Sequence, residues 1–310
     1  MRSLIGAARS ARRLGAGRTS AEGVREGLLG GRLPFLAAGA GPPVLVLPGL
    51  SARHRNPSGP ERSGLLRPMR GLSGTRTMYL VQRTPGARPG VTMGDLAADC
   101  AAAIRADLPS PLPVVGISSG GAVALHLALD HPDLVERLLL VSAACRLDEH
   151  GRAAQRRMAD ELYSGHPRCA WAALAAPMAA GLAGRLGMGA LLWVAGRRLT
   201  GDDPSELLAT LEAEDRFDLC DRLGQITAPA LVVGGSRDGF YGQAGFEQTA
   251  AGLPRAELRS SPARATPPRC LSPLGATSAT SYGSSRPARE TGLELRCGGR
   301  AVRALSAHRA

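Results

Sequence analysis

VVGISSGGAVALHLALDHPDLVERLLLVS, residues 114–142, is the stretch that decides the fold. A short apolar run leads into a glycine- and serine-rich corner, a helical pattern follows, and a second apolar run, RLLLVS, ends the stretch. Short apolar runs bounded by glycine are typical of strands buried on both faces. The order strand, helix, strand therefore predicts two parallel strands joined by a right-handed crossover.

The corner itself reads Gly116-Ile117-Ser118-Ser119-Gly120, a G-x-S-x-G pattern lying between a strand and a helix. Small residues at 116 and 120 allow a sharp turn, on which Ser118 adopts strained backbone angles and raises its Oγ above the sheet. We expect Ser118 to be a nucleophile, and the N–H of Ser119, at the helix N-terminus, to face a developing oxyanion. The alternative is a plain tight turn without chemistry.

The rest of the chain repeats this alternation of strands and helices. Apolar runs predict an edge strand at 31–39 and further strands at 44–50, 78–83 and 229–239, and amphipathic patterns predict helices at 92–108 and 245–252. These elements predict an α/β fold with a doubly wound, mostly parallel sheet. Residues 149–224 have helical patterns only, and a helical block between two strands of one sheet predicts a cap over the carboxyl ends of the strands.

One part of this block, Cys169–Gly196, is long and apolar enough to raise the question of a membrane span. Arg185 and Pro177 interrupt it and alanine and glycine dominate it, so we expect two short packed helices and no membrane partner.

Charge and cysteine content bound the function classes. The 310 residues carry a formal net charge of +12. Ten arginines, three glutamates and no aspartate lie in residues 255–310, so the middle of the chain is nearly neutral and no nucleic-acid binding is expected for it. The Arg/Pro/Ser-rich tail is predicted to be disordered, and binding of nucleic acid or an anionic membrane by this tail is a separate hypothesis.

Six scattered cysteines without metal-ligand spacing predict reduced thiols, a cytoplasmic protein and no metal.

Several motifs in order resemble the α/β-hydrolase superfamily: Leu47-Pro48-Gly49-Leu50 after an early strand, the corner at Ser118, Asp130-His131-Pro132-Asp133 before RLLLVS, and Gly235-Ser236-Arg237-Asp238 after a late strand. The resemblance implies that the N–H groups of Leu50 and Ser119 form the oxyanion site and that Asp238 is the orienting acid. A serine nucleophile implies hydrolysis of an ester, thioester, lactone or amide of a small-molecule acyl substrate through an acyl-enzyme, with no cofactor.

The resemblance covers residues 31–258, and implies a hydrolase core at 31–148 and 225–258 with a helical cap at 149–224 between the two parts. Composition predicts a poorly ordered basic leader at 1–30 and a low-complexity tail at 259–310. The oligomeric state and the identity of the substrate stay open.

The general base is the catalytic group that the family's motifs do not locate in this sequence. The family places a histidine after the last strand, in the order Ser, Asp, His. In this chain the family's last strand, histidine loop and closing helix would fall at about residues 256–285, where the arginine-rich tail begins; a shifted reading frame is one hypothesis for this change. Only His308 follows Asp238, which makes it the one candidate at the expected place in the order. Two interpretations stay open: a serine hydrolase impaired by the missing histidine, or a catalytically inactive binding protein of the same fold.

Overall fold

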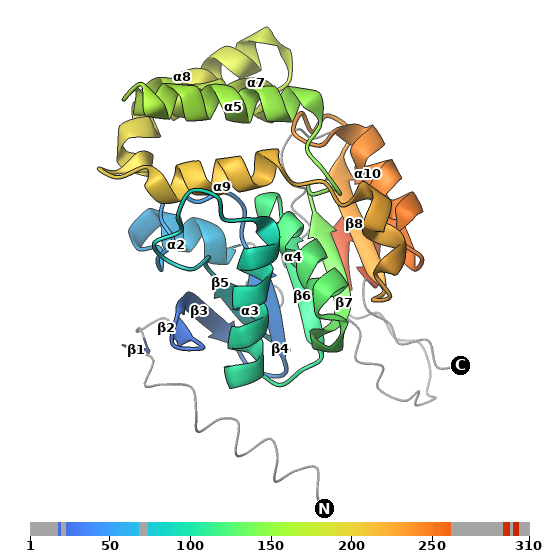
Figure 1. Cartoon of the computed structure of the whole chain (residues 1–310). Coiled ribbons are helices and arrows are strands. Elements are labelled where there is room, and N and C mark those ends of the chain that lie inside the picture. The colour runs from blue at the N-terminus through green and yellow to red at the C-terminus, as the bar shows by residue number, and fades with distance from the viewer. Residues whose placement is uncertain (1–17, 20–22, 68–73, 262–293, 298–299, 304–310) are drawn as a thin grey trace, which may run out of the picture.

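The computed structural model describes residues 18–19, 23–67, 74–261, 294–297 and 300–303 (Figure 1). Its central feature is a nine-stranded sheet in the order β1-β2-β3-β5-β4-β6-β7-β8-β9. A separate antiparallel pair joins β10 to β11. The strands are β1 (Arg18–Thr19), β2 (Arg25–Leu29), β3 (Leu33–Gly39), β4 (Pro43–Leu47), β5 (Thr77–Val81), β6 (Leu112–Ile117), β7 (Val135–Val141), β8 (Ala230–Gly235), β9 (Ala256–Ser261), β10 (Glu294–Cys297) and β11 (Arg300–Arg303). Most of the predicted disordered tail lies outside the described residues.

Strand directions confirm the doubly wound, mostly parallel sheet. Strands β5, β4, β6, β7, β8 and β9 are parallel to one another, whereas β3 pairs antiparallel with both β2 and β5. The prediction of an edge strand at 31–39 was therefore wrong, because β2 covers that edge. The sheet also extends beyond the predicted core at both ends. Strand β2 lies inside the segment predicted as a leader, which ends at residue 30, and β9 continues the sheet past residue 258 to Ser261.

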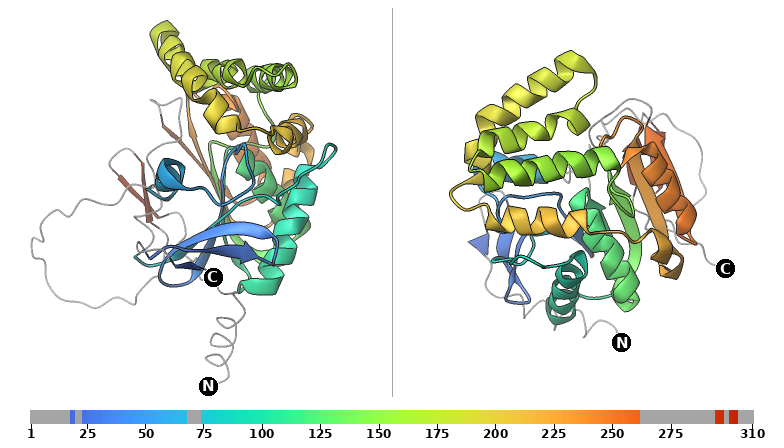
Figure 2. Two further views of the ribbon diagram at one scale, coloured as in Figure 1. Left: turned by 90° about the vertical axis from the view of Figure 1, so that its left-hand side faces the viewer. Right: turned by 45° about the horizontal axis from the view of Figure 1, so that its top comes forward.

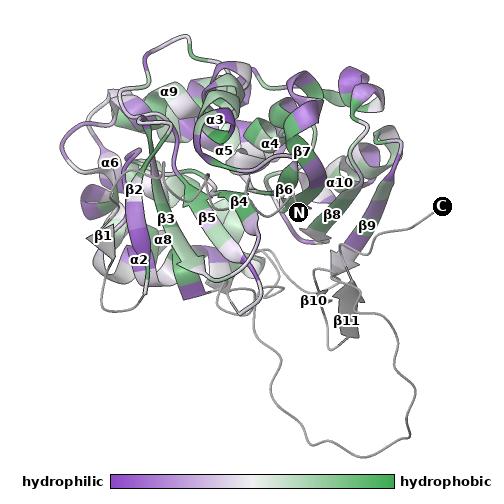
Figure 3. Cartoon of the chain, turned by 90° about the horizontal axis from the view of Figure 1, so that it is seen from below, coloured by the Kyte–Doolittle hydropathy of each residue, from purple (hydrophilic) through white to green (hydrophobic). Residues whose placement is uncertain are grey.

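The continuous apolar runs arise because both faces of the central strands are buried. Along β4, Leu45 and Leu47 pack in the cluster on one face and Val44 and Val46 in the cluster on the other. Side chains alternate between faces along a strand, so a strand covered on both sides needs apolar residues at every position. Figure 3 shows the contrast with the marginal strands β2 and β9, which carry hydrophilic residues.

Helices α3, α4 and α10 pack on one face of this sheet (Figure 1). Helix α3 begins where the sequence predicts, with Thr92 and Asp95 forming a reciprocal capping box. The helices are α2 (Gly59–Leu66), α3 (Met93–Asp107), α4 (Ser119–Asp130), α5 (Glu149–Tyr163), α6 (Pro167–Ala173), α7 (Ala175–Met178), α8 (Gly181–Thr200), α9 (Ser205–Asp215) and α10 (Gly242–Gly252), with short 3₁₀ turns η2 (Pro132–Leu134) and η3 (Cys220–Gln225).

Helices α5 to α9 gather above the end of the sheet where α4 begins (Figures 1 and 2). They share a small apolar core that includes Met158, Leu207 and Leu211, and Ala52 from the loop after β4 packs into it. This helical segment is thus attached to the loop that follows Gly49.

A disulfide joins Cys145, just before the helical segment, to Cys220, just after it. The N–H of Leu219 also donates to the carbonyl oxygen of Cys145 at 2.9 Å, so the two junctions lie side by side. The expectation of reduced thiols was wrong for this pair because the fold brings together two cysteines that are 75 residues apart in the chain. Cys100, buried, and Cys169, exposed, are free.

Helix α8 departs from the expected pair of short packed helices. It runs without a break for 20 residues through Arg185, and Leu182, Leu186, Leu191 and Val194 on it are exposed. Nowhere in the described residues is there a helix with the length and apolar character that a bilayer crossing needs.

Glycines let α4 approach the strands beneath it. A Cβ on Gly120 would lie 2.2 Å from the carbonyl oxygen of Leu47, and one on Gly116 would lie 2.6 Å from the Cα of Gly121. Both distances are below any van der Waals contact, so the sequence needs glycine at these positions to bring the helix start over the ends of β4 and β6.

We expect Gly120→Ala to lower the free energy of unfolding by about 1–3 kcal/mol, because the added methyl group overpacks backbone that cannot move aside. The matched control is Gly187→Ala in α8, where an added Cβ would meet nothing within 4 Å. That change should stabilise by about 0.5–1 kcal/mol through helix propensity. Urea denaturation followed by circular dichroism measures both, and equal effects of the two variants would contradict the packing argument.

Candidate functional site

Ser118 lies at the junction of β6 and α4 with φ 50° and ψ −126°. Only one other non-glycine residue among those described, Ser142, has a positive φ. Side chains of L-residues crowd the backbone there, so the turn is strained and its surroundings must hold it. The N–H of Ser118 donates to the carbonyl oxygen of Val141 at 2.9 Å, and its own carbonyl accepts from the N–H of Gly121 at 2.7 Å.

The turn after β4 lies against Ser118. A Cβ on Gly49 would be 3.3 Å from the Cβ of Ser118 and 3.8 Å from its Oγ. The peptide unit that carries the N–H of Leu50 is therefore next to the serine side chain. This is the arrangement that the sequence predicts for the two turns.

The guanidinium group of Arg83 donates hydrogen bonds to both of these turns. Its Nη1 donates to the carbonyl oxygen of Gly49 at 3.0 Å and its Nη2 donates to the Oγ of Ser119 at 2.7 Å. In a planar trans peptide the C=O and N–H point in opposite directions. Because Arg83 binds the carbonyl oxygen of the 49–50 peptide, the N–H of Leu50 points away from the guanidinium group.

Arg83 is a buried cation, 6% exposed. Burial lowers the pKa of Arg83, and the nearby Glu214 carboxylate opposes this shift. An arginine remains charged even under such conditions, so a positive charge stands permanently beside the two turns. Its position directly after the buried strand β5 places it at the carboxyl edge of the sheet.

Asp238 lies in the loop after β8 and is 8% exposed. Its Oδ1 accepts the N–H groups of Phe240 at 2.9 Å and Tyr241 at 3.1 Å. Burial raises the pKa of Asp238, and these two N–H groups together with the Ser142 side chain work in the other direction. The carboxyl group is thus held rigidly at the end of the sheet, and is not a solvated turn residue.

Tyr241 connects Asp238 to Glu214. Its backbone N–H donates to Oδ1 of Asp238 at 3.1 Å and its hydroxyl donates to Oε1 of Glu214 at 2.7 Å. Glu214 is fully buried on α9, and its Oε2 accepts from Nε2 of Gln155 at 3.1 Å. Tyr241, Glu214 and Gln155 therefore form a buried row of hydrogen-bonded side chains that leads from the start of α10 into the helical segment.

Three of the described histidines pair with carboxylates and not with Ser118. His126, His150 and His166 pair with Asp130, Asp148 and Glu161, and His131 follows the last turn of α4. His308, the sequence-predicted candidate for the base, lies outside the described residues.

His54 is buried between two segments. Its Nδ1 faces the carbonyl oxygen of Thr84 at 3.1 Å and its Nε2 faces the hydroxyl of Thr210 on α9 at 3.2 Å. Burial, followed by the charge of Arg83, lowers the pKa of His54 to about 4. The ring is therefore neutral at neutral pH and joins the loop after β4 to α9.

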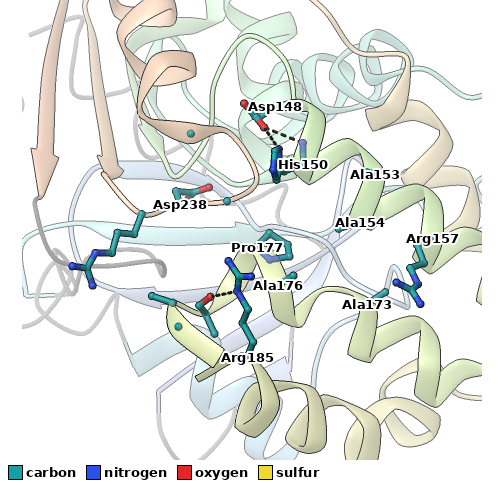
Figure 4. Close-up of a pocket in the computed structure, with 16 residues that line it drawn as sticks. Asp148, His150, Ala153, Ala154, Arg157, Ala173, Ala176, Pro177, Arg185 and Asp238 are labelled. Carbon is teal, nitrogen blue, oxygen red and sulfur yellow. Dashed lines mark hydrogen bonds and ion pairs between the residues drawn. The ribbon is translucent and has the colours of Figure 1, made fainter. Parts of the chain in front are cut away.

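A hollow of about 640 Å³ adjoins Asp238 between α5, α7 and the loop after β8 (Figure 4). Alanine side chains and Pro177 form apolar walls, and three arginines also line it. Ser118 is not among the lining residues, so the hollow meets the site at Asp238. The lining residues are Asp148, His150, Ala153, Ala154, Arg157, Ala173, Ala176, Pro177, Ala179, Ala180, Gly181, Arg185, Arg237, Asp238, Gly239 and Gly242. In the part of the chain that the structure describes, no cluster of side chains has the make-up of a metal site.

The structure thus brings the predicted residues Ser118, Ser119 and Leu50 to adjoining turns, and places Asp238 in the loop after β8, where its Oδ1 accepts the N–H of Tyr241. The sequence analysis missed Arg83, Tyr241 and Glu214. A signal existed for Glu214, because Leu207, Leu211 and Glu214 follow the helical spacing of one buried face.

Comparison with known proteins defines the class. Residues 81–264, more than half of the chain, match the family model of the alpha/beta hydrolase fold. The chain belongs to this family, as the motifs in its sequence indicate.

Individual proteins are similar to this chain over part of their sequence or in their fold. Pimeloyl-[acyl-carrier protein] methyl ester esterase of Neisseria meningitidis serogroup B / serotype 15 (strain H44/76) is 34% identical over 165 residues, which cover 49% of this chain and 60% of that protein. The chain thus spans about three fifths of the length of this relative. The enol-lactonase of Burkholderia xenovorans LB400 has a similar fold, with TM-score 0.62, 18% identity, and coverage of 77% of this chain and 92% of that one. A hydrolase from Pseudomonas aeruginosa PA01 gives a TM-score of 0.61 at 18% identity, covering 80% of this chain and 90% of that one.

The lowered pKa of His54 predicts a pH-dependent stability. Between about pH 6.5 and 4 the unfolded chain binds a proton at this site that the folded chain does not, so the folded state loses stability as the pH falls through this window. At about pH 5 the loss from His54 should be about 2 kcal/mol relative to neutral pH. Urea denaturation at the two pH values measures it. His54→Gln should lack this part of the loss, whereas the control His150→Gln, 92% exposed at its side chain, should retain it. A pH dependence in His54→Gln equal to that of the unmodified chain would contradict the assignment.

Proposed function

We propose that the protein is a serine hydrolase that cleaves a carboxylic ester, or a closely related acyl bond, through an acyl-enzyme on Ser118. The observation that carries this proposal is the positive φ of Ser118 at the strand-to-helix corner. A strained backbone is costly, and it is kept where it serves to present a reactive group. The strain here raises one hydroxyl beside the start of a helix, which is what a nucleophile requires.

The oxyanion of the tetrahedral intermediate would be bound by the N–H groups of Leu50 and Ser119. Two backbone donors that are fixed before the reaction stabilise the developing charge without reorganisation. Arg83 supports both, since it binds the carbonyl oxygen of Gly49 and the side chain of Ser119. In this proposal Arg83 is a positioning residue that also supplies a nearby positive charge.

Asp238 would be the acid of the site, held by the N–H groups of Phe240 and Tyr241. Its place after β8 is the place at which the family carries the acid that orients a general base. His308 remains the candidate for that base in chain order.

Helices α5 to α9 would act as the cap that covers the site, since they stand over the end of the sheet at which α4 begins (Figure 2), and Ser118 directly precedes α4. An acyl ester is the proposed substrate class, because the relatives in the family include methyl ester esterases and a lactonase. The apolar walls and the arginines of the hollow beside Asp238 suit an acyl chain that ends in an anionic group.

The competing proposal is an inactive binding protein of the same fold, favoured by the absence of a histidine partner for Ser118 among the described residues. A fluorophosphonate probe separates the two, because it reacts only with an activated serine. Labelling of the folded protein supports the hydrolase, and failure to label it supports the binding protein.

Ser118→Ala should abolish fluorophosphonate labelling and hydrolysis of a p-nitrophenyl ester, because the nucleophilic oxygen is gone. Ser119→Ala should still be labelled, at a lower rate, since its backbone N–H remains while the hydrogen bond from Arg83 to its hydroxyl is lost. Mass spectrometry of the labelled peptide identifies the modified serine. Labelling that persists in Ser118→Ala, or that maps to Ser119, would refute the assignment of the nucleophile.

Arg83→Lys should reduce kcat by about 10²-fold, because an ammonium group cannot bind both turns and the Leu50 N–H loses its orientation. KM should change less, since Arg83 does not contact the substrate in this proposal. The matched control is Arg62→Lys, which alters an arginine that pairs with Glu26 away from the site. An unchanged kcat in Arg83→Lys would show that the two turns hold their positions without the guanidinium fork.

A further inference from the structure

Helix α8 presents apolar side chains to solvent on the side of the helical segment that faces away from the sheet (Figures 1 and 2). Among the described residues eight large apolar side chains are exposed, and six of them lie on this one helix. Such a concentration of exposed apolar surface marks a place where a protein contacts a partner. The six residues are Leu182, Leu186, Leu191, Trp193, Val194 and Leu199.

Helix α8 packs closely along one side only. A Cβ on Gly196 would lie 2.7 Å from a carbonyl oxygen of α6, and a Cβ on Gly189 would lie 3.6 Å from a Cβ of α7. These glycines are about two helical turns apart, so they share the side that packs. Leu191 and Val194 lie on the opposite side, and they are 64% and 70% exposed. We call the side that carries Leu191 and Val194 the free side of α8.

The charged residues around this helix are all positive. Residues 162–201 contain four arginines and neither aspartate nor glutamate. All four arginines are exposed, and in the part of the chain that the structure describes none of them has a carboxylate partner. The guanidinium carbon of one, Arg168, lies 4.5 Å from the centre of the Trp193 ring, so a cation stands directly on the apolar surface. The four are Arg168, Arg185, Arg197 and Arg198.

We propose that the free side of α8 binds the surface of an anionic lipid bilayer, at the boundary between headgroups and acyl chains. Helices that combine leucine, valine and tryptophan with basic residues lie in this boundary. The long apolar stem of arginine lets its charge reach lipid phosphates while neighbouring apolar side chains are buried. This binding does not involve Ser118, so it goes beyond the proposed function and stands independently of it.

Other occupants of the free side match these observations less well. A second copy of the chain would bring four arginines against four arginines, and like charges across an interface repel. An acidic protein would match the charge, but protein interfaces centre on aromatic and arginine anchors, and leucine and valine are uncommon among them. The sequence argument against a membrane partner concerned a crossing, in which Arg185 would enter hydrocarbon. On a bilayer surface Arg185 remains among the headgroups.

Sedimentation of the full chain with lipid vesicles tests the apolar part of the proposal. The unmodified chain should bind vesicles of equal parts phosphatidylcholine and phosphatidylglycerol, and should bind phosphatidylcholine vesicles far more weakly. Leu191→Gln/Val194→Gln should weaken binding to the anionic vesicles about 10²-fold, because two apolar side chains no longer enter the bilayer. Glutamine is a good helix former, so α8 is retained, as circular dichroism verifies. The matched control is Leu28→Gln on β2, an exposed leucine away from α8, which should bind as the unmodified chain does.

The charged part is tested with Arg198→Gln. Loss of one arginine near an anionic surface should weaken binding about fivefold. Added salt should weaken the binding of the unmodified chain, because it screens the attraction between arginines and headgroups. The matched control is Arg105→Gln, which removes an exposed arginine in the last turn of α3 and should change the binding little.

Anionic-vesicle binding by Leu191→Gln/Val194→Gln at the strength of the unmodified chain would overturn the proposal, because the contact would then come from elsewhere, such as the arginine-rich residues 255–310. Equal binding to the two kinds of vesicle would overturn the anionic partner. Dimerisation in analytical ultracentrifugation that the double substitution abolishes would assign the free side to a second copy. No binding to anionic vesicles would also overturn it, and binding of poly-glutamate that the double substitution abolishes would then assign the free side to an acidic protein.

Discussion

The close approach of α4 to the ends of β4 and β6 is the constraint on which the rest of the site depends. A helix start can lie this near to two strands only if Gly116, Gly120 and Gly121 carry no side chains, since a Cβ on each would overlap backbone or a neighbouring side chain. This approach forces Ser118 into its positive φ and places it against Gly49. The packing of the sheet against α4 therefore supplies the energy that holds the strained serine.

A buried polar cluster of Arg83, Glu214 and Tyr241 lies near this corner, and removing its charges from water costs free energy. Arg83 and Glu214 are both removed from water, and their charges stabilise each other without a direct ion pair between them. Buried charges of this kind rarely improve stability over apolar residues of similar size. Arg83 holds the turns of Gly49 and Ser119, and Glu214 holds Tyr241. The cluster thus fixes the positions of the groups around Ser118, which is a reason for a chain to keep it.

Local patterns predicted the parallel sheet, the helices α3 and α4 and the corner at Ser118, because each depends on residues close together in the chain. The disulfide between Cys145 and Cys220 was not predictable, since it depends on the return of the chain after the helical segment. The same holds for Tyr241 and Glu214, which are 27 residues apart and meet only after α9 packs over the sheet. Strand β2 was missed because REGLL is too polar and short to be distinguished from a leader. Exposure of α8 was missed because an apolar sequence ordinarily indicates burial.

The helical segment is tied to the loops that lie beside Ser118. Glu214 on α9 reaches Tyr241, His54 joins α9 to the loop after β4, and Ala52 of that loop packs in the core of the segment. A displacement of α9 would therefore separate Glu214 from Tyr241 and loosen the turn that carries the Leu50 N–H. The disulfide at the two junctions limits such displacement, because it holds the points at which the segment leaves and rejoins the sheet. The position of the Tyr241 hydroxyl therefore depends on a helix that is far away in the sequence.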